Sequence, residues 1–251
     1  MTGASRGIGR AVAERGLERG MAVCGIARSA DALAELAAAA PDRVTTAAVD
    51  VRDQAAVAAA VADAADRFGP PTIAVAAAGV LGPIDRPWLL DGAALSETLA
   101  VTVTGTANLA AAVVPAMLAA GRGAFVAVSA SSATRVFPGW AAYGAAKAGL
   151  DAFVRHLAEE GGDGLTAFSF VPGLTDTAMQ AGLRDVAAER FPMVDEFRRW
   201  HERGAAKAPS AVADALELAL ALPRDEVHGR VVDADALLRA QRQALRADSS
   251  R

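Results

Sequence analysis

The residues of this chain best suited to proton transfer are a tyrosine and a lysine four positions apart. Tyr143 is the single tyrosine among 251 residues, and Lys147 is one of two lysines, the other being Lys207. A spacing of four places both side chains on one face of a helix. A nearby ammonium lowers the pKa of a phenol, so such a tyrosine can exchange a proton with a carbonyl or alcohol oxygen. The competing interpretation is a pair of solvated side chains on a helix surface.

A glycine-rich segment at the start of the chain predicts a phosphate-binding turn. Residues 2–9 read Thr-Gly-Ala-Ser-Arg-Gly-Ile-Gly. Glycines at these positions permit a tight turn and a close approach to a pyrophosphate, and the helix that follows offers unpaired N–H groups. The residues expected to form the turn are Gly3, Ser5, Arg6, Gly7, Ile8 and Gly9.

Two arginines indicate which dinucleotide would bind. The next predicted strand ends in Ala27-Arg28, where NAD-binding folds commonly place an acid on the ribose 2′-hydroxyl. Arg6 lies on the same side, in the glycine turn. Two guanidinium groups match a 2′-phosphate in charge and in forked geometry, which favours NADP(H) over NAD(H). The alternative is two solvated arginines in an arginine-rich chain.

The elements that must position these residues alternate between short apolar runs and longer alanine-rich stretches. The predicted strands are Met21–Ala27, Val44–Val49, Thr72–Ala77, Ala124–Val128, Leu165–Val171 and Gly229–Val232. The predicted helices are Gly9–Arg19, Ala30–Ala39, Gln54–Phe68, Ala94–Leu118, Ala142–Glu160 and Ala211–Leu220. This alternation predicts an α/β fold, a doubly wound parallel (Rossmann-like) sheet in a single domain over residues 1–251. Residues 172–209 interrupt it and are predicted to be a helical insertion that covers the substrate, or else a surface helix pair.

Composition excludes several classes of protein. The chain is 53% hydrophobic and 22% charged, with a net charge of −4, so we expect a globular protein that binds neither nucleic acid nor an anionic membrane. The single cysteine, Cys24, leaves no internal disulfide, and the three histidines lack metal-ligand spacing, so no metal site is expected. We see neither a signal peptide nor an apolar run of membrane-spanning length, which predicts a soluble cytoplasmic protein.

The glycine turn and the Tyr143-x-x-x-Lys147 motif together resemble the short-chain dehydrogenase/reductase family, over the whole chain. Within it, the likeness is greatest to the branch of sepiapterin reductase and benzil reductase, as in the segment Pro-Gly-Trp-Ala-Ala-Tyr at residues 138–143. The resemblance implies NADPH-dependent reduction of a ketone, an α-dicarbonyl or a pterin-like substrate, with Tyr143 as proton donor. It also implies a homodimer or homotetramer, formed through the helices predicted at Ala94–Leu118 and Ala142–Glu160.

Further positions are expected at the cofactor or the substrate. Asp50 stands where an acid accepts from the adenine amino group, although it can equally cap the next helix. Trp140 and Asp233 are expected at the substrate, with core packing and a charged strand end as the respective alternatives. The remaining cofactor positions are Val51, Gly79, Pro172, Gly173, Thr175 and Thr177.

Two departures from the family pattern concern the start of the chain and the catalytic serine. The family has a strand before the glycine turn, and Met1 stands where that strand would end, so we expect the true start to lie several codons upstream. The family's serine, 13 residues before the tyrosine, is replaced by Ala130. Ser129 and Ser131 flank it, and Ser131 is the favoured substitute because it extends past the strand.

Two more departures affect the support of the site. The family's Asn-Asn-Ala-Gly turn reads Ala-Ala-Ala-Gly at residues 76–79, and Thr102 replaces the asparagine that supports the lysine. These losses admit a second hypothesis, a cofactor-binding protein with weak or no turnover that acts as a sensor or scaffold. The retained Tyr143 and Lys147 favour the enzyme.

Overall fold

Six parallel strands form the centre of the protein in a computed structural model that describes residues 1–248. They are β1 (Val23–Ala27), β2 (Val44–Ala48), β3 (Ile73–Ala76), β4 (Ala124–Val128), β5 (Thr166–Val171) and β6 (Val231–Asp233). β1 pairs with β2, and the other four follow in the order β3-β4-β5-β6. Each predicted strand is present, which confirms the α/β, Rossmann-like class. β6 begins two residues later than predicted, at Val231.

The first residues of the chain lie between the two groups of strands and hydrogen-bond to both. Thr2 bridges Ile26 of β1 and Ala76 of β3, and its amide donates to the Val75 carbonyl at 3.0 Å. Before it, the terminal ammonium of Met1 donates to the Cys24 carbonyl at 2.6 Å, and burial lowers the pKa of this amine. Met1 and Gly3 extend this connection on the β1 side, because the Ile26 amide donates to the Met1 carbonyl at 2.9 Å and the Gly3 amide donates to the Ile26 carbonyl at 2.8 Å. The helices α3 (Gln54–Phe68) and α5 (Gly105–Ala119), which also pack against each other, lie over β1 and β3 respectively.

A cavity of about 340 Å³ lies beside Met1, between the first halves of β1 and β3 and the helices above them. Its walls are mostly apolar side chains. They include Met1, Cys24, Val61, Phe68, Ile73 and Leu109. β1 and β3 are therefore bridged by Thr2 near their carboxyl ends, and this cavity separates them near their amino ends.

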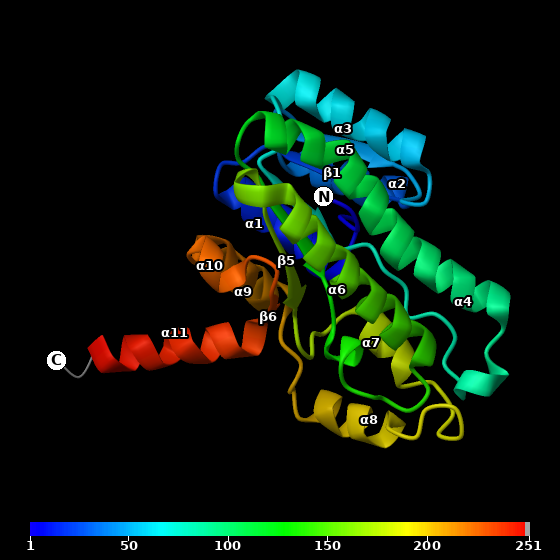
Figure 1. Cartoon of the computed structure of the whole chain (residues 1–251). Helices are drawn as coiled ribbons and strands as arrows, with labels where there is room; N and C mark the ends of the chain where they lie inside the picture. Colours follow the sequence, from blue (N-terminus) through cyan, green and yellow to red (C-terminus); the bar gives the residue numbers. More distant parts are fainter. Residues whose placement is uncertain (249–251) are drawn as a thin grey trace.

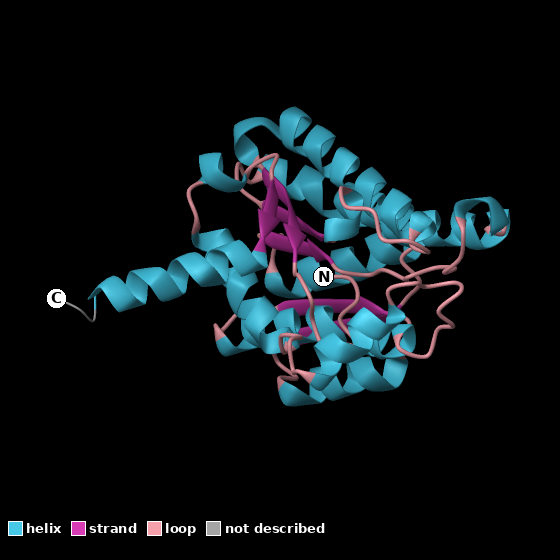
Figure 2. Ribbon diagram, turned by 90° about the horizontal axis from the view of Figure 1, so that it is seen from below, coloured by secondary structure: helices cyan, strands magenta, loops and turns pink. Residues whose placement is uncertain are grey.

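Helices cover both faces of the sheet (Figures 1 and 2). α1 (Gly7–Glu18), α2 (Ala30–Ala39) and α9 (Pro209–Ala221) pack on one face, and α3 (Gln54–Phe68), α5 (Gly105–Ala119) and α6 (Ala141–Gly161) pack on the other. The central strands alternate between the two cores: Phe125 of β4 packs with α5 and α6, whereas Val126 packs with α9. Being apolar on both faces, such strands read as continuous hydrophobic runs.

The helix predicted at Ala94–Leu118 is interrupted. It consists of α4 (Gly92–Leu99), a π-helical turn (Ala100–Thr104) and α5. Contrary to the expectation from the sequence, this run (Gly92–Ala119) is long and apolar enough to cross a membrane, and 56% of its most apolar window is buried inside the protein. That burial is typical of the core helix of a sheet protein.

The rest of the chain adds smaller elements and one projecting helix. Residues 172–209 contain α7 (Ala178–Leu183) and α8 (Val194–Glu202), which agrees equally with a substrate-covering insertion and with a surface helix pair. α10 (Arg224–Val227) precedes β6. The helix α11 (Ala234–Asp248), which was not predicted, contacts the rest of the protein through its first turns and then projects outward toward the C-terminus (Figures 1 and 2). Short 3₁₀ turns stand at Pro87–Leu89, Ser131–Ala133 and Gly162–Gly164.

Candidate active site

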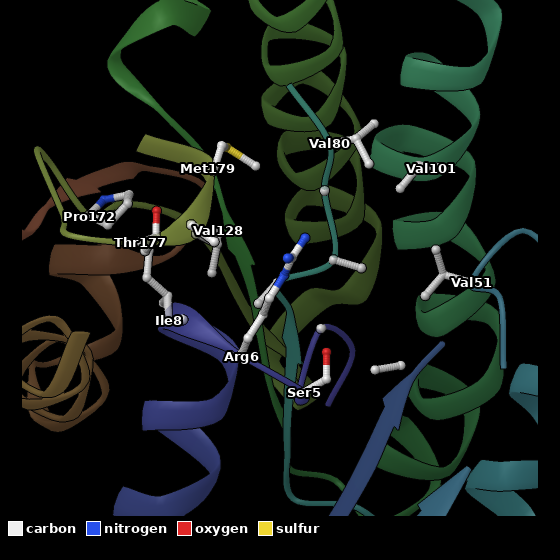
Figure 3. A pocket seen from close by; sticks show the side chains of 18 of the residues that line it. Ser5, Arg6, Ile8, Val51, Val80, Val101, Val128, Pro172, Thr177 and Met179 are labelled. Atoms are coloured by element: carbon white, nitrogen blue, oxygen red, sulfur yellow. The ribbon is translucent and has the colours of Figure 1, made fainter. Parts of the chain in front are cut away.

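A cavity of about 420 Å³ opens at the carboxyl ends of the strands, where parallel α/β sheets bind their ligands (Figure 3). It contains the glycine turn, the ends of β1 and β4, the start of α6 and the beginning of the 172–209 segment. Most of the predicted site residues line this one cavity. They are Gly3, Ser5, Arg6, Gly7, Ile8, Gly9, Arg28, Asp50, Val51, Gly79, Ser129, Tyr143, Lys147, Pro172 and Thr177.

The glycines of the turn stand at positions where a side chain would not fit. Gly3 has φ +71° and Gly7 φ +57°, in the left-handed region that favours glycine. A Cβ on Gly3 would lie 2.8 Å from the Ala77 carbonyl oxygen, and a Cβ on Gly9 would overlap the carbonyl oxygen of Gly3. The turn leads directly into α1 at Gly7, so free N–H groups face the cavity. These residues form a cradle that fits the pyrophosphate of a dinucleotide.

Charged side chains stand at the far end of the cradle. Arg6 and Arg28 are exposed, and Figure 3 shows the Arg6 side chain extending across the cavity. Asp50 is bound by both of its oxygens to Arg52, at 2.9 and 2.7 Å, and these bonds lower its pKa to about 2. The alternative role of Asp50 as a helix cap is wrong: Asp53 caps α3 by accepting from the Ala56 amide.

α6 presents Tyr143 and Lys147 on the side that faces the cavity. Lys147 is buried; its ammonium donates to the Val128 carbonyl at 2.6 Å and lies 5.6 Å from the centre of the Tyr143 ring. Burial lowers the pKa of Lys147 to about 8 and raises that of Tyr143 to about 12. The expected lowering of the tyrosine pKa by the lysine is therefore outweighed by desolvation. At neutral pH the phenol is a proton donor beside a cation.

The two serines beside Ala130 lie in different surroundings. The Ser129 amide still donates to the Phe170 carbonyl of β5, and Ser129 is among the residues that line the cavity. The residue is 1% exposed, and its hydroxyl is buried without a hydrogen-bond partner among the described residues. Ser131 begins a 3₁₀ turn, is exposed, and is not part of the cavity wall. The structure therefore brings Ser129, rather than the favoured Ser131, into the cavity with Tyr143.

Four other predicted residues lie outside the cavity wall. Gly173 and Thr175 belong to the base of the 172–209 segment, where Thr175 forms a bridge with Lys207. Trp140 is buried in a cluster of aromatic rings and meets Tyr143 edge-on at 5.6 Å. Asp233 is exposed and caps the first turn of α11 by accepting from the Ala236 amide.

Sequence reasoning did not name several wall residues, most of them apolar. They are Ala27, Val49, Ala77, Ala78, Val80, Val101, Val128, Asp176, Ala178, Met179 and Pro209. Most contribute backbone or a short apolar side chain, which carries no chemical signal in a sequence. Thr102, in the π-helical turn, is fully buried, and its hydroxyl has no partner within residues 1–248.

A sheet of this kind with a glycine cradle and a Tyr–Lys pair in one cavity defines a dinucleotide-dependent oxidoreductase. The family model described as short chain dehydrogenase matches residues 1–187. Benzil reductase ((S)-benzoin forming) of Bacillus subtilis is 28% identical over 93% of this chain and 96% of its own length. Glycine betaine reductase of Emericella nidulans is 34% identical over 89% of this chain, but the chain spans 17% of that longer protein.

Solved structures agree with these matches. A short chain dehydrogenase/reductase of Saccharomyces cerevisiae superposes with a TM-score of 0.88 and 29% identity, covering 94% of this chain and 96% of its own. The chain belongs to the short-chain dehydrogenase/reductase family and is an NAD(P)-dependent oxidoreductase. Within the described residues, no group of three His, Cys, Asp or Glu side chains is arranged to hold a metal ion.

Proposed function

We propose that this protein reduces a ketone or an α-dicarbonyl compound with NADPH. The observation that carries the proposal is that Tyr143, Lys147 and Ser129 line the same cavity as the glycine turn. The buried hydroxyl of Ser129 has no hydrogen-bond partner among the described residues. A cofactor cradle, a proton donor and a carbonyl-binding serine therefore share one space. The similar benzil reductase of Bacillus subtilis, which by its name forms (S)-benzoin from the diketone benzil, supports this substrate class.

NADPH fits the polar groups of the cradle. The glycine turn would hold the pyrophosphate, and Val51, Gly79, Pro172 and Thr177 line the same cavity. Arg6 and Arg28 would bind the 2′-phosphate, because forked guanidinium groups pair well with phosphate and Arg28, not an acid, follows Ala27. The carboxylate of Asp50 would accept from the adenine amino group. When bound, NADPH supplies the hydride.

The chain's own residues supply the proton and the orientation. Tyr143 donates its phenolic proton to the carbonyl oxygen, and the raised pKa keeps that proton on the phenol near neutral pH. Lys147 offsets the negative charge that then forms on the phenolate. The Ser129 hydroxyl donates a hydrogen bond to the carbonyl oxygen, and thus takes the role expected of the position occupied by Ala130.

The substrate enters beneath the 172–209 segment, whose Met179 and Thr177 line the cavity. Trp140 shapes this side through its edge contact with Tyr143. Asp233 caps α11 outside the cavity wall, which gives no support to a pterin-like substrate. We further propose a cytoplasmic homodimer or homotetramer, assembled through the faces of α4, α5 and α6 that point away from the sheet.

The test is a binding titration followed by turnover. Fluorescence titration is expected to show NADPH binding at least about tenfold more tightly than NADH, with the difference lost in Arg28→Ala, because a charge-assisted hydrogen bond is worth about 1.5–3 kcal/mol. Benzil and other diketones are then supplied with NADPH, with Tyr143→Phe as the inactive control. Equal affinity for both dinucleotides would refute the cofactor assignment. Tight binding without turnover of any diketone or ketone would favour the sensor or scaffold.

A further inference from the structure

A third ionisable side chain continues the catalytic stripe of α6. Asp151 follows Lys147 by four residues, as Lys147 follows Tyr143, so the three groups lie in line along one side of the helix. Asp151 is 3% exposed, and its Oδ1 atom has no hydrogen-bond partner among the described residues. A carboxylate buried in this way is costly unless another charge compensates it.

The charge that compensates it is one helical turn away. Lys147 is 4% exposed, and the single acceptor found for its ammonium within residues 1–248 is the neutral Val128 carbonyl. Each of these two side chains is thus buried without a direct ionic contact among the described residues. Asp151 acts on Lys147 through space and opposes the lowering of the lysine pKa by burial.

Other carboxylates are poorly placed to take this part. Two elements packed against α6 carry one each within the described residues: Glu97 on α4, which is exposed and 3.8 Å from Arg52, and Asp163 on the turn at the far end of α6. Further along α6, Glu159 and Glu160 are exposed. Because these carboxylates are exposed or lie at the far end of the helix, water and salt screen their effect on Lys147.

We propose that Asp151 is a positioning residue, the buried counter-charge that keeps Lys147 an ammonium beside Tyr143. Its effect on catalysis rests on the proposed function. When Tyr143 gives up its proton, a negative charge forms in a desolvated site, and the cationic form of Lys147 stabilises it. Asp151 does not touch the substrate; it sets the pH range over which Lys147 carries that charge.

The proposal can be tested without activity, because the chain has only two lysines. Protein labelled biosynthetically with [ε-¹³C]lysine gives two side-chain signals, and Lys207→Arg assigns the one from Lys147. We expect Lys147 to titrate with a pKa of about 8, and Asp151→Asn to lower that midpoint by at least about half a unit. Glu160→Gln, which removes an exposed carboxylate from the same helix, is the matched control and leaves the midpoint unchanged.

Asn has the shape of Asp, and Asp151→Ser is the second variant in case Asn does not fold. An unchanged Lys147 midpoint in a folded variant of either kind overturns the proposal. The pH profile of kcat/KM for diketone reduction is the second measurement. In Asp151→Asn its alkaline limb moves to lower pH by the same amount, with activity recovered in mild acid, whereas a purely structural role lowers the whole profile evenly.

The two proposals fail in different ways. A wild-type protein that turns over no carbonyl compound while Lys147 still shifts in Asp151→Asn refutes the proposed function and leaves Asp151 as the counter-charge of Lys147. An active protein whose Lys147 midpoint ignores Asp151 refutes the counter-charge and leaves the proposed function standing.

Discussion

Replacing Ser129 with alanine is expected to change activity and stability in opposite directions. Ser129 lines the cavity, and its hydroxyl is buried without a partner within the described residues. An unsatisfied buried polar group costs about 1–3 kcal/mol, so Ser129→Ala removes a penalty and creates almost no cavity. For a protein of this size we expect Tm to rise by roughly 2–4 °C for each kcal/mol gained.

The activity of the same variant is expected to fall by about 10²–10³ in kcat, the usual loss for one hydrogen-bond donor to a developing oxyanion. The assay is the decrease in NADPH absorbance with a diketone, run beside calorimetry on the same samples. Ser131→Ala is the matched control: the side chain is exposed and outside the cavity wall, so both readouts stay close to the wild type. An active Ser129→Ala protein beside an inactive Ser131→Ala protein would refute the assignment.

Three further predictions concern other parts of the molecule. Near-ultraviolet titration of Tyr143, the sole tyrosine, is expected to show no phenolate until the pH approaches its raised pKa of about 12, and phenolate at mildly alkaline pH would contradict the dominance of burial. The ring of His228 accepts from the Ala167 amide, and burial lowers its pKa. The folded state favours neutral His228, so its contribution to the free energy of unfolding is fully present above the unfolded pKa of about 6.5 and is lost as the pH falls through the folded pKa. Urea denaturation at several pH values measures this dependence. His228→Gln should weaken it, and an unaltered dependence in that variant would disprove the assignment. Gly9→Ala is expected to abolish dinucleotide binding, because its Cβ would overlap the Gly3 carbonyl oxygen, whereas Gly20→Ala, with open space around it, tests the general cost of losing a glycine; wild-type binding by Gly9→Ala would contradict the tight turn.

The strands were predictable because burial on both faces requires apolar runs; the boundaries of β4 match the prediction at both ends. The break between α4 and α5 was not predictable, since Ala100–Thr104 continues the apolar pattern without a glycine or proline. α11 was missed although Ala234, Leu237 and Leu238 follow the i, i+3, i+4 spacing of a helix face and pack on the core.

The choice between the two serines shows why spacing alone did not place the site. Counting back from Tyr143 ends at Ala130 and leaves its two neighbours equivalent. The structure distinguishes them by the backbone: Ser129 is still hydrogen-bonded to β5, whereas the chain turns toward solvent at Ser131. The pKa of Tyr143 is raised, whereas the sequence predicted that it would be lowered, for a similar reason. Desolvation depends on neighbours from distant segments, which the spacing of residues on one helix does not reveal.

The cavity at the glycine turn lies across the place where Thr2 bridges the two groups of strands. Arg28 and Asp50 approach this cavity from the side of β1 and β2, while Lys147 and Thr177 approach it from the side of the other four strands. Any molecule that spans the cavity therefore contacts both groups of strands and adds a further connection between them. Because such a molecule binds only when both groups of strands are folded, its binding free energy stabilises them together. The occupied protein is therefore expected to unfold more nearly as one cooperative unit.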